Sequence, residues 1–540
     1  MALLEMLRRE STVSQTKMSF ISALSGLSNA LILALINLSI ESAAQYNLHF
    51  RHLFLFLVVL SLFIVTRRYV AIHATTELQA VLHKVRVRLA DKIRHADLEP
   101  LEKIGRSDLY SSVNRETDTI SQAGRPMQQA FQSAILFFFT LIYIALISFI
   151  AFILFCVLIW VSAAIYLRRK RAIRNEMYGA LESENKLFDS LTHVLDGFKE
   201  IKINTARSDD VFHHIIQRSN IARGLKSRVE IEFALLSLFS IVSFYGGLAV
   251  VVFLLPTLNP EYSQVVVKVT TAVLFIIGPI FTIIGAVPDI ANAQVAAQTI
   301  ANVEEELDRA AYYRTVPGPA FDSSQEIVLD GVVFQFDESS GRPFSVGPID
   351  LTVKAGEILF IAGGNGSGKS TLLKLLTALY YPQKGTIRID GTTLGESTYT
   401  AYRNLFSVIF SDYHLFDRIY GLGEVDPARV HEWLKVLEIE DKTSFVNGEF
   451  TNLDLSTGQR KRLALLVSML ENKSIYVFDE WAADQDPVFR RRFYRELLPG
   501  LKSRGKTVIA VTHDDSYYDA ADRLLMMKDG RLVHLEREPQ

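Results

Sequence analysis

Cysteine is almost absent from this chain: its 540 residues include one, Cys156, inside an apolar run. A single cysteine excludes an intrachain disulfide, so nothing in the sequence requires an oxidising compartment, and Cys156 is expected to be a small buried hydrophobe. Net charge is nearly absent too, at −2, so no global field attracts an acidic partner and no nucleic-acid partner is expected. Internal repeats and low-complexity segments are also lacking.

Apolar residues are abundant, at 49% of the chain. The length exceeds that of an ordinary single domain, so two or more domains are expected. The pattern changes near residue 320, where long uncharged runs give way to short apolar strands, helical patterns and glycine-rich turns. We therefore expect a transmembrane domain over 1–315, a linker over 316–326 and a soluble domain over 327–540.

The first residues, MALLEMLRREST, lack the long apolar core and the small-residue cleavage site of a signal peptide. Two alternatives are open. The segment is a short amphipathic helix on the inner membrane surface, with Arg8 and Arg9 facing lipid headgroups, or it is a frayed terminus.

Two early apolar runs are candidates to cross a bilayer, whose core of about 30 Å needs about 20 apolar residues of helix. The first run is Met18–Ile40. The second, His52–Thr66, is short and is bracketed by Arg51 and Arg67, whose side chains can reach the interface if it spans.

Later apolar runs supply four more expected spans. The uncharged run over 126–167 is too long for one helix and fits two with almost no outer loop. The fifth and sixth spans fit within 233–255 and 265–287, with a kink expected at Pro279.

Basic residues set the expected orientation. Segments 67–125 and 168–232 carry eleven and thirteen Lys/Arg, whereas the connection over 256–264 carries none. Because cytoplasmic loops are enriched in Lys and Arg, both long loops, the N-terminus and the soluble domain are expected in the cytoplasm.

Both long loops look helical throughout. We expect the membrane helices to extend into the cytoplasm, with short crossing helices at tips near 111–120 and 206–215. The alternative is a pair of independent cytoplasmic helical hairpins.

The clearest chemical motif is GGNGSGKST, which satisfies G-x-x-x-x-G-K-[ST] between an apolar strand and a helix. Glycines in such a loop let backbone N–H groups converge on phosphate oxygens at the positive end of the following helix. The predicted nucleotide-binding residues are Gly363, Gly364, Asn365, Gly366, Ser367, Gly368, Lys369, Ser370 and Thr371. Lys369 is expected to reach the β- and γ-phosphates of ATP, and Ser370 to ligate Mg²⁺.

A second motif, SIYVFDE over 474–480, ends an apolar strand in two carboxylates. Asp479 is the expected Mg²⁺ ligand and Glu480 the expected general base for the attacking water. Many strands end in acidic residues, so the motif gains weight only because it follows the phosphate loop.

Three further stretches complete a resemblance to ABC transporters. LDLSTGQRKRLAL over 453–465 resembles the signature LSGGQ, with Thr457 in place of the first glycine. AADQD over 482–486 occupies the place of the D-loop, and VIAVTHD carries His513 at the place of the switch histidine. The motifs occur in the family's order.

The resemblance implies roles for these residues. Ser456, Thr457, Gly458 and Gln459 would contact the γ-phosphate of ATP held by a second subunit, and Asp486 would belong to the nucleotide site. His513 would contact the γ-phosphate, and Phe336 would stack on adenine. Each has a structural alternative: Phe336 as core, His513 as a structural histidine, and Ser456 with Gly458 as an ordinary helix N-cap.

The resemblance covers nearly the whole chain. It implies a six-helix, type IV ABC exporter transmembrane domain fused to an α/β P-loop ABC nucleotide-binding domain, with ATP and Mg²⁺ as cofactors. One chain supplies one phosphate loop and one signature, which cannot face each other within a domain. A homodimer in the lipid bilayer is therefore expected, working by alternating access, and a heterodimer stays open.

One departure concerns the loop where the family has a glutamine. VIFSDYHLFDRIYG places Ser411 there, followed by Asp412, and either could ligate Mg²⁺ or orient water. This stretch and FDEWAADQDPVFRRRFYRELLP resemble exporters of cyclic peptides and peptide siderophores of the pyoverdine and syringomycin type. The implied function is ATP-driven export of a cyclic or modified peptide across the bacterial inner membrane. Lipid or multidrug export, and a regulatory ATPase that transports nothing, are the alternatives.

Residues that recognise cargo cannot be selected from the sequence. Polar residues in the spans serve helix packing at least as often as cargo binding. They are Asn29, Asn37, Tyr143, Ser243, Tyr245 and Thr282. Lys268 is expected either to reach the outer surface or to attract an acidic cargo.

Overall fold

The computed structural model describes residues 2–10, 15–44, 50–254, 263–310, 321, 325–336 and 344–534. The chain forms two compact units. One comprises Met1–Arg94 with Ile104–Glu306, and the other comprises His95–Lys103 with Leu307–Gln540. The expected linker over 316–326 lies mostly outside the described residues.

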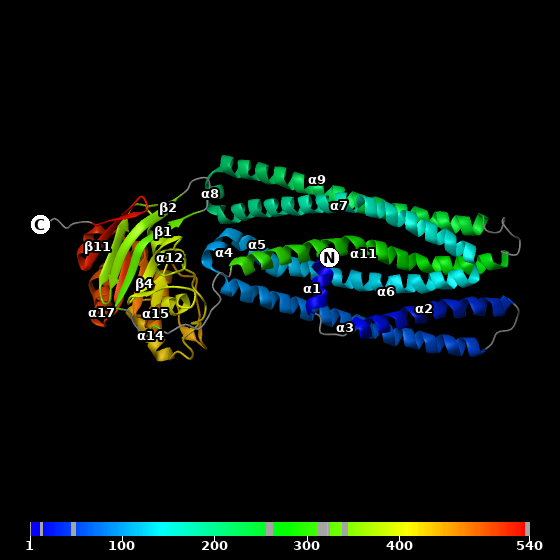
Figure 1. The fold of residues 1–540 in the computed structure, drawn as a ribbon, viewed down its shortest axis with the longest axis horizontal. Coiled ribbons are helices and arrows are strands. Elements are labelled where there is room, and N and C mark those ends of the chain that lie inside the picture. The colour runs from blue at the N-terminus through cyan, green and yellow to red at the C-terminus, as the bar shows by residue number, and fades with distance from the viewer. Residues whose placement is uncertain are drawn as a thin grey trace. The chain divides into compact units, whose positions relative to one another are not determined.

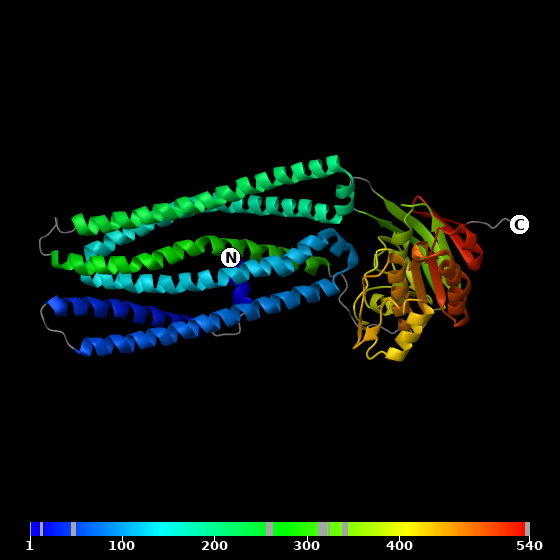
Figure 2. The same ribbon diagram turned by 180° about the vertical axis from the view of Figure 1, so that it is seen from behind.

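The first unit is built from long helices, and α7 and α9 run side by side in it, as do α2 and α6 (Figures 1 and 2). Its elements are α1 (Ala2–Glu10), α2 (Gln15–Ala44), α3 (Phe50–His95), α5 (Arg106–Tyr110), π-helix η1 (Ser111–Glu116), α6 (Thr117–Ile147), α7 (Phe149–Asp196), α8 (Phe198–Ile203), α9 (Thr205–Ala249), π-helix η2 (Val250–Leu254) and α11 (Ser263–Ala310).

Five helical segments among the described residues are long and apolar enough to cross a membrane. They lie in α2, α3, the segment Asp108–Ile147, α9 and α11. α7 adds a shorter apolar stretch, Phe149–Val161. The five segments coincide with five of the predicted spans, and the shorter stretch in α7 falls where the fourth span is predicted.

The connections between spans differ in length. Only Ser148 separates α6 from α7; its backbone is extended and its side chain accepts the N–H of Ala151 at 3.4 Å. The predicted near-absence of an outer loop is therefore confirmed. The short second run is part of α3, which continues into the first long loop, and α11 continues through Pro279 and Pro288.

The long loops extend the membrane helices, as predicted, but the predicted tips were wrong. The short helices at the tips are α4 (Leu98–Ile104) and α8, both earlier in the chain than the segments 111–120 and 206–215. Gly197 ends α7, and Asn204 has an extended backbone and accepts the N–H of Arg207 at 3.1 Å to begin α9. Glycine and asparagine mark such breaks in a sequence, and this signal was overlooked.

The N-terminal segment is a packed helix, so the frayed alternative is wrong. Leu3 is buried and its N–H donates to Gln294 Oε1 of α11 at 3.3 Å. Arg88 of α3 pairs with Glu10 and, through Nε, with Glu304 Oε1 at 2.7 Å. α1 is thereby held to two long helices of its own unit.

The second unit contains two principal sheets (Figure 1). A six-stranded sheet has the order β12-β11-β3-β10-β9-β6, and its pairs are parallel except β11 with β12. Its strands are β3 (Ile358–Gly363), β6 (Phe406–Ile409), β9 (Ile475–Asp479), β10 (Thr507–Val511), β11 (Arg523–Lys528) and β12 (Arg531–His534). An antiparallel sheet has the order β2-β1-β4-β5, formed by β1 (Glu326–Gln335), β2 (Ser345–Lys354), β4 (Lys384–Ile389) and β5 (Thr392–Thr393).

Helices cover the parallel sheet. They are α12 (Lys369–Leu376), α13 (Tyr399–Arg403), α14 (Pro427–Val436), α15 (Thr457–Glu471), α16 (Pro487–Arg492) and α17 (Leu498–Ser503), with a π-helical turn, η6 (Phe493–Leu497), before α17. Strands β9 and β10 are buried along their whole length, as strands of a sheet covered on both faces are. The carboxyl ends of β3, β9 and β10 meet at one edge, which is where ligands bind in such sheets.

Candidate nucleotide-binding site

The phosphate loop joins β3 to α12, and its shape requires glycine. Gly363 has φ +150°, and a Cβ there would lie 2.3 Å from the carbonyl oxygen of Met527. Gly368 has φ +102° and precedes the first residue of α12, Lys369. The buried Lys369 Nζ donates to the carbonyls of Gly363 and Gly364 at 3.0 Å each. The Lys369 side chain therefore folds back and bonds to its own loop.

The middle of the loop is open. Gly364, Asn365 and Gly366 are exposed, whereas Ser367 is buried and its Oγ has no hydrogen-bond partner among the described residues. Thr371 is half-buried in the first turn of α12. Exposed backbone beside the positive end of a helix suits a phosphate group.

Asp479 is the centre of a cluster of oxygen ligands. Its Oδ2 accepts from Ser370 Oγ at 3.0 Å and from Ser411 Oγ at 3.2 Å. Its Oδ1 is buried without a hydrogen-bond partner in the described chain, and burial raises the pKa of this carboxyl above its usual range. A carboxylate and two hydroxyls fit Mg²⁺, which prefers oxygen ligands. Asp412, the alternative to Ser411, makes no side-chain hydrogen bond within the described residues.

Glu480 lies between the phosphate loop and the histidine after β10. Its Oε1 is 3.0 Å from His513 Nε2 and 3.6 Å from Lys369 Nζ. Its backbone is left-handed, with φ +50°, and its N–H donates to the carbonyl of Val511 at 3.1 Å. A residue other than glycine in this conformation is strained, and such strain collects at functional sites.

Lys461 is a contact of Glu480 that the sequence analysis missed. This lysine of α15 is buried, and its Nζ donates to the carbonyl of Glu480 and pairs with Asp484, both at 2.7 Å. Its own carbonyl accepts from Trp481 Nε1 at 2.9 Å. The signal was available: Lys461 lies one turn before Leu465 on the apolar face of α15, where a lone lysine needs a buried partner.

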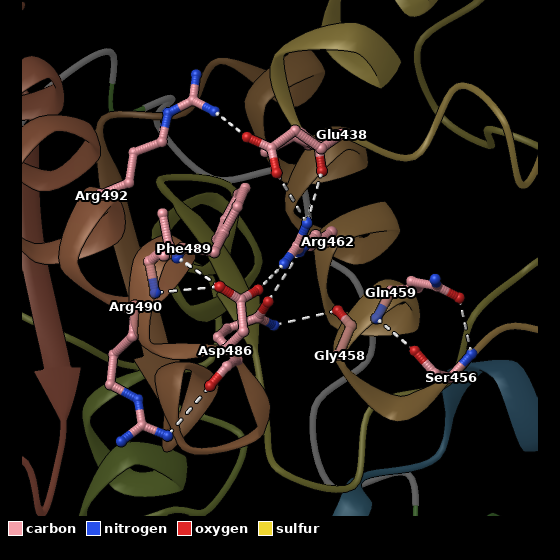
Figure 3. A network of polar contacts seen from close by, with 12 residues as sticks. Glu438, Ser456, Gly458, Gln459, Arg462, Asp486, Phe489, Arg490 and Arg492 are labelled. Carbon is pink, nitrogen blue, oxygen red and sulfur yellow. Dashed lines mark hydrogen bonds and ion pairs between the residues drawn. The ribbon is translucent and has the colours of Figure 1, made fainter.

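The signature residues begin α15. Ser456 Oγ accepts the N–H of Gln459 at 3.4 Å, and Gln459 Oε1 accepts the N–H of Ser456 at 3.1 Å (Figure 3). This is a capping box, with Thr457 as the first helical residue. The carbonyl of Gly458 accepts from Gln485 Nε2 at 3.1 Å. The structural alternative for Ser456 is thus confirmed, and a cap of this kind still presents a helix N-terminus.

Asp486 lies with the signature helix rather than with the phosphate loop. It caps α16 by accepting the N–H groups of Val488 and Phe489 at 3.1 and 2.9 Å (Figure 3). The Phe489 N–H lowers the pKa of Asp486 most. Arg462 of α15 pairs with Asp486 at 2.5 Å and lies 3.8 Å over the Phe489 ring. Arg462 of α15 therefore connects the predicted D-loop to the signature helix through an ion pair and a ring contact.

Phe336 is half-buried beside a true core residue. Its ring meets that of Phe334, which is 1% exposed, edge-on at 5.1 Å. The N–H of Phe336 donates to the carbonyl of Phe344 at 3.2 Å, and the Phe344 ring lies against Gly368 of the phosphate loop. Phe344 thus adjoins the loop and was not predicted, whereas the Phe336 ring lies 6.5 Å from that of Phe344.

α4 and Asp97, the residue before it, pack inside the nucleotide unit through acidic side chains. Glu102 accepts from Lys374 Nζ of α12 at 2.8 Å and from the hydroxyl of Tyr380. Asp97 accepts from the Tyr381 hydroxyl at 2.6 Å. Tyr380 also stacks on the core, with its ring 4.7 Å from that of Phe334. The helix that follows the phosphate loop is therefore bonded to the tip of the first long loop.

Comparison with known proteins gives a consistent result. Residues 346–483 match the family model described as ABC transporter. The ATP-binding protein SyrD of Pseudomonas syringae pv. syringae is 30% identical over 96% of this chain and 94% of its own length.

Two further relatives match in part. The probable syringafactin export ATP-binding/permease protein SyfD of Pseudomonas syringae pv. syringae is 32% identical over 38% of this chain and 33% of its own length. An ATP-dependent lipid A-core flippase of Alkalilimnicola ehrlichii is 31% identical over 48% of this chain and 46% of its own length.

A solved structure shares the fold along nearly the whole chain. It is that of a bacterial Atm1-family ABC exporter with ATP bound, with a TM-score of 0.77 at 18% identity, covering 98% of this chain and 95% of that chain. The apolar helices, the phosphate loop and the near-full-length relative agree. This chain belongs to the ABC transporter family, as an exporter half-transporter that crosses the membrane several times and couples ATP hydrolysis to transport.

Proposed function

We propose that two copies of this chain form a homodimer with two shared ATP sites. In the described chain, Lys369 bonds to its own loop and to Glu480, whereas Ser456 bonds only within α15. The phosphate loop and the signature share no hydrogen bond or ion pair in the described chain. A head-to-tail partner would set its signature helix N-terminus against the γ-phosphate of this chain's ATP.

The catalytic assignment rests on the Asp479–Glu480 pair. Ser370, Ser411 and Asp479 would hold Mg²⁺, which when bound neutralises phosphate charge. Glu480 is held beside Lys369 and His513, so its carboxylate is placed to accept a proton from water at the γ-phosphate. His513 would orient that carboxylate and contact the phosphate itself.

The cargo is proposed to be a cyclic or modified peptide, exported across the bacterial inner membrane. The observation that carries this is the partial similarity to a protein whose name states syringafactin export. The near-full-length similarity to SyrD supports the ABC transporter architecture on which the proposal depends. Closure of the nucleotide domains would drive alternating access. The movement would reach α4 through the bonds that Lys374 and Tyr380 donate to Glu102.

Transport into inverted vesicles tests the proposal. The full chain is reconstituted in proteoliposomes with its nucleotide domains outside. A tritiated cyclic decapeptide or a fluorescent phospholipid is added outside with MgATP, and its movement into the vesicles is measured. We expect ATP-dependent accumulation of the peptide and none with E480Q. The partial similarity to a lipid A-core flippase favours a second candidate. Phospholipid movement without peptide accumulation would replace peptide export with lipid export.

A further inference from the structure

The first unit contains an apolar cavity of about 590 Å³ between α6, α7, α9 and α11. Its wall is mostly aromatic and aliphatic, with Phe155 and Ile280 on opposite helices. α9 lines it from Glu230 to Phe244, a separation of about 21 Å at 1.5 Å per residue. That length is about two-thirds of the ~30 Å hydrocarbon core, so the cavity runs along the membrane spans.

Glu230 is the one charged side chain among the described residues of the cavity wall. It is exposed, and within the described chain it has no hydrogen bond or ion pair, whereas nearby Lys226 is paired with Glu184 at 3.6 Å. Glu230 comes just before the predicted fifth span, at its cytoplasmic end. A single carboxylate on an otherwise apolar wall supplies a charge that can orient a ligand with a cationic group.

Serines are the only other strongly polar groups on this wall in the described chain. Ser237, Ser240 and Ser243 recur every three residues along α9. Ser240 Oγ is bonded to the carbonyl of Leu236 at 2.9 Å, but Ser237 and Ser243 make no side-chain hydrogen bond within the described residues. A few placed polar groups in an apolar pocket orient a ligand without anchoring it along its length.

We propose that this cavity binds a cargo that carries both an apolar chain and a cationic group. The chain lies along α9 and α11, and an amine or guanidinium pairs with Glu230 at the cytoplasmic end. The inference rests on the proposed peptide export and narrows that cargo to a cationic, acylated peptide. A phospholipid is a poorer occupant because its phosphate would lie against the Glu230 carboxylate.

The test uses the full chain in phosphatidylcholine nanodiscs and three probes: N-dodecanoyl-trilysine amide, the same peptide without the acyl chain, and N-dodecanoyl-triglutamate amide. Stimulation of ATPase activity is measured against probe concentration. We expect only the acylated trilysine to stimulate. E230Q should raise its half-stimulating concentration at least tenfold, and Ser240→Phe, which fills the cavity, should do the same.

E232Q is the matched control, because Glu232 lies two residues further along α9 and does not line the described cavity. It should leave both the half-stimulating concentration and the basal ATPase activity within twofold of the unaltered chain. Equal stimulation by unacylated trilysine, by acylated triglutamate, or by acylated trilysine on E230Q would overturn the inference. After any of these results, transport of the cyclic decapeptide separates two cases. If the decapeptide still accumulates in vesicles, only the cationic, acylated cargo is ruled out. If no peptide accumulates, the proposed peptide export is ruled out as well.

Discussion

The two units use large apolar side chains in opposite ways. In the nucleotide unit, Phe360 and Phe478 are 0% and 1% exposed within the parallel sheet. In the membrane unit, Phe54, Phe138 and Trp160 are 66%, 59% and 72% exposed. A bilayer solvates such side chains, whereas water does not. A hydrophobic run therefore identifies a buried strand in one unit and a lipid-facing helix in the other.

Polar groups show the same contrast. In the nucleotide unit they join distant segments, as Ser370 and Asp479 do. Hydroxyls in the membrane helices mostly bond back to their own helix, as Thr282 does to the carbonyl of Gly278 at 3.0 Å. Asn37 is an exception, because it donates to the Tyr143 hydroxyl at 2.9 Å and joins α2 to α6. That contact favours helix packing over cargo binding for this pair.

The largest effect on ATP turnover should come from replacing Glu480, the proposed general base of the nucleotide unit. Glu480→Gln should lower ATP turnover by about 10²–10⁴-fold, the range for removing a general base. Binding of ATP should persist because the phosphate loop is untouched. Phosphate release and binding of a fluorescent ATP analogue measure the two quantities.

Glu496→Gln is the control for that substitution, since Glu496 pairs with Arg492 on the surface rather than with the site. Its turnover should stay within twofold of the unaltered chain. Turnover of Glu480→Gln at more than a tenth of the original rate would remove Glu480 as the base.

A pair of phenylalanine substitutions tests the contrast in burial. Phe478→Ala should destabilise the nucleotide unit by about 3–5 kcal/mol because it opens a cavity in a packed core. Phe138→Ala, at an exposed position of α6, should change stability by less than about 0.5 kcal/mol. Thermal unfolding in nanodiscs measures both. Similar losses for the two variants would mean that Phe138 packs against protein and not against lipid.

The ATP site was largely predictable because its chemistry is carried by short local patterns. GGNGSGKST and VFDE each combine a strand, a turn and functional side chains within ten residues. Each motif therefore identified its own residues, and the order of the motifs in the resembled family brought Ser370 and Asp479, 109 positions apart, into one predicted site. The contact of Tyr380 with Glu102 joins residues 278 positions apart. No local pattern encodes such a contact, which depends on how α4 packs.

The membrane unit was predictable in outline only. Uncharged runs located the five long spans and the shorter apolar stretch of α7, because a bilayer imposes a length on apolar helices. The loop tips were misplaced because Gly197 and Asn204, which set the ends of α8, lie within sequence that is helical on both sides. The cavity beside Glu230 depends on the spacing of four helices, which hydropathy does not specify.

A smaller effect is expected at Lys461, the buried contact of Glu480. Lys461→Gln should lower ATP turnover about ten- to hundredfold, the equivalent of a charge-assisted hydrogen bond of about 1.5–3 kcal/mol. The KM for ATP should stay within twofold, because Lys461 reaches the backbone of Glu480 and not the phosphate loop. Lys435→Gln, at an exposed position of α14, should leave turnover unchanged.

A double substitution tests whether Lys461 and Asp484 act on ATP turnover as a pair. If Lys461 acts through its pair with Asp484, adding Asp484→Asn to Lys461→Gln should cost little more than Lys461→Gln alone. Additive losses would show that the two side chains act independently.

The smallest effect concerns the thermal stability of the chain at Asp479. Burial raises the pKa of this carboxyl above its usual range. The folded chain then holds the proton more tightly than the unfolded chain, so ionising Asp479 costs stability as pH rises from the ordinary pKa to the raised one. Asp479→Asn removes that cost and keeps an oxygen that accepts from Ser370 and Ser411. Without nucleotide it should raise Tm at neutral pH by a few degrees, at about 2–4 °C per kcal/mol. The difference should vanish at a pH below the ordinary pKa, although hydrolysis is lost throughout. Thermal unfolding against pH measures this, and a lower Tm for the variant at neutral pH would show that the ionised carboxylate stabilises the fold.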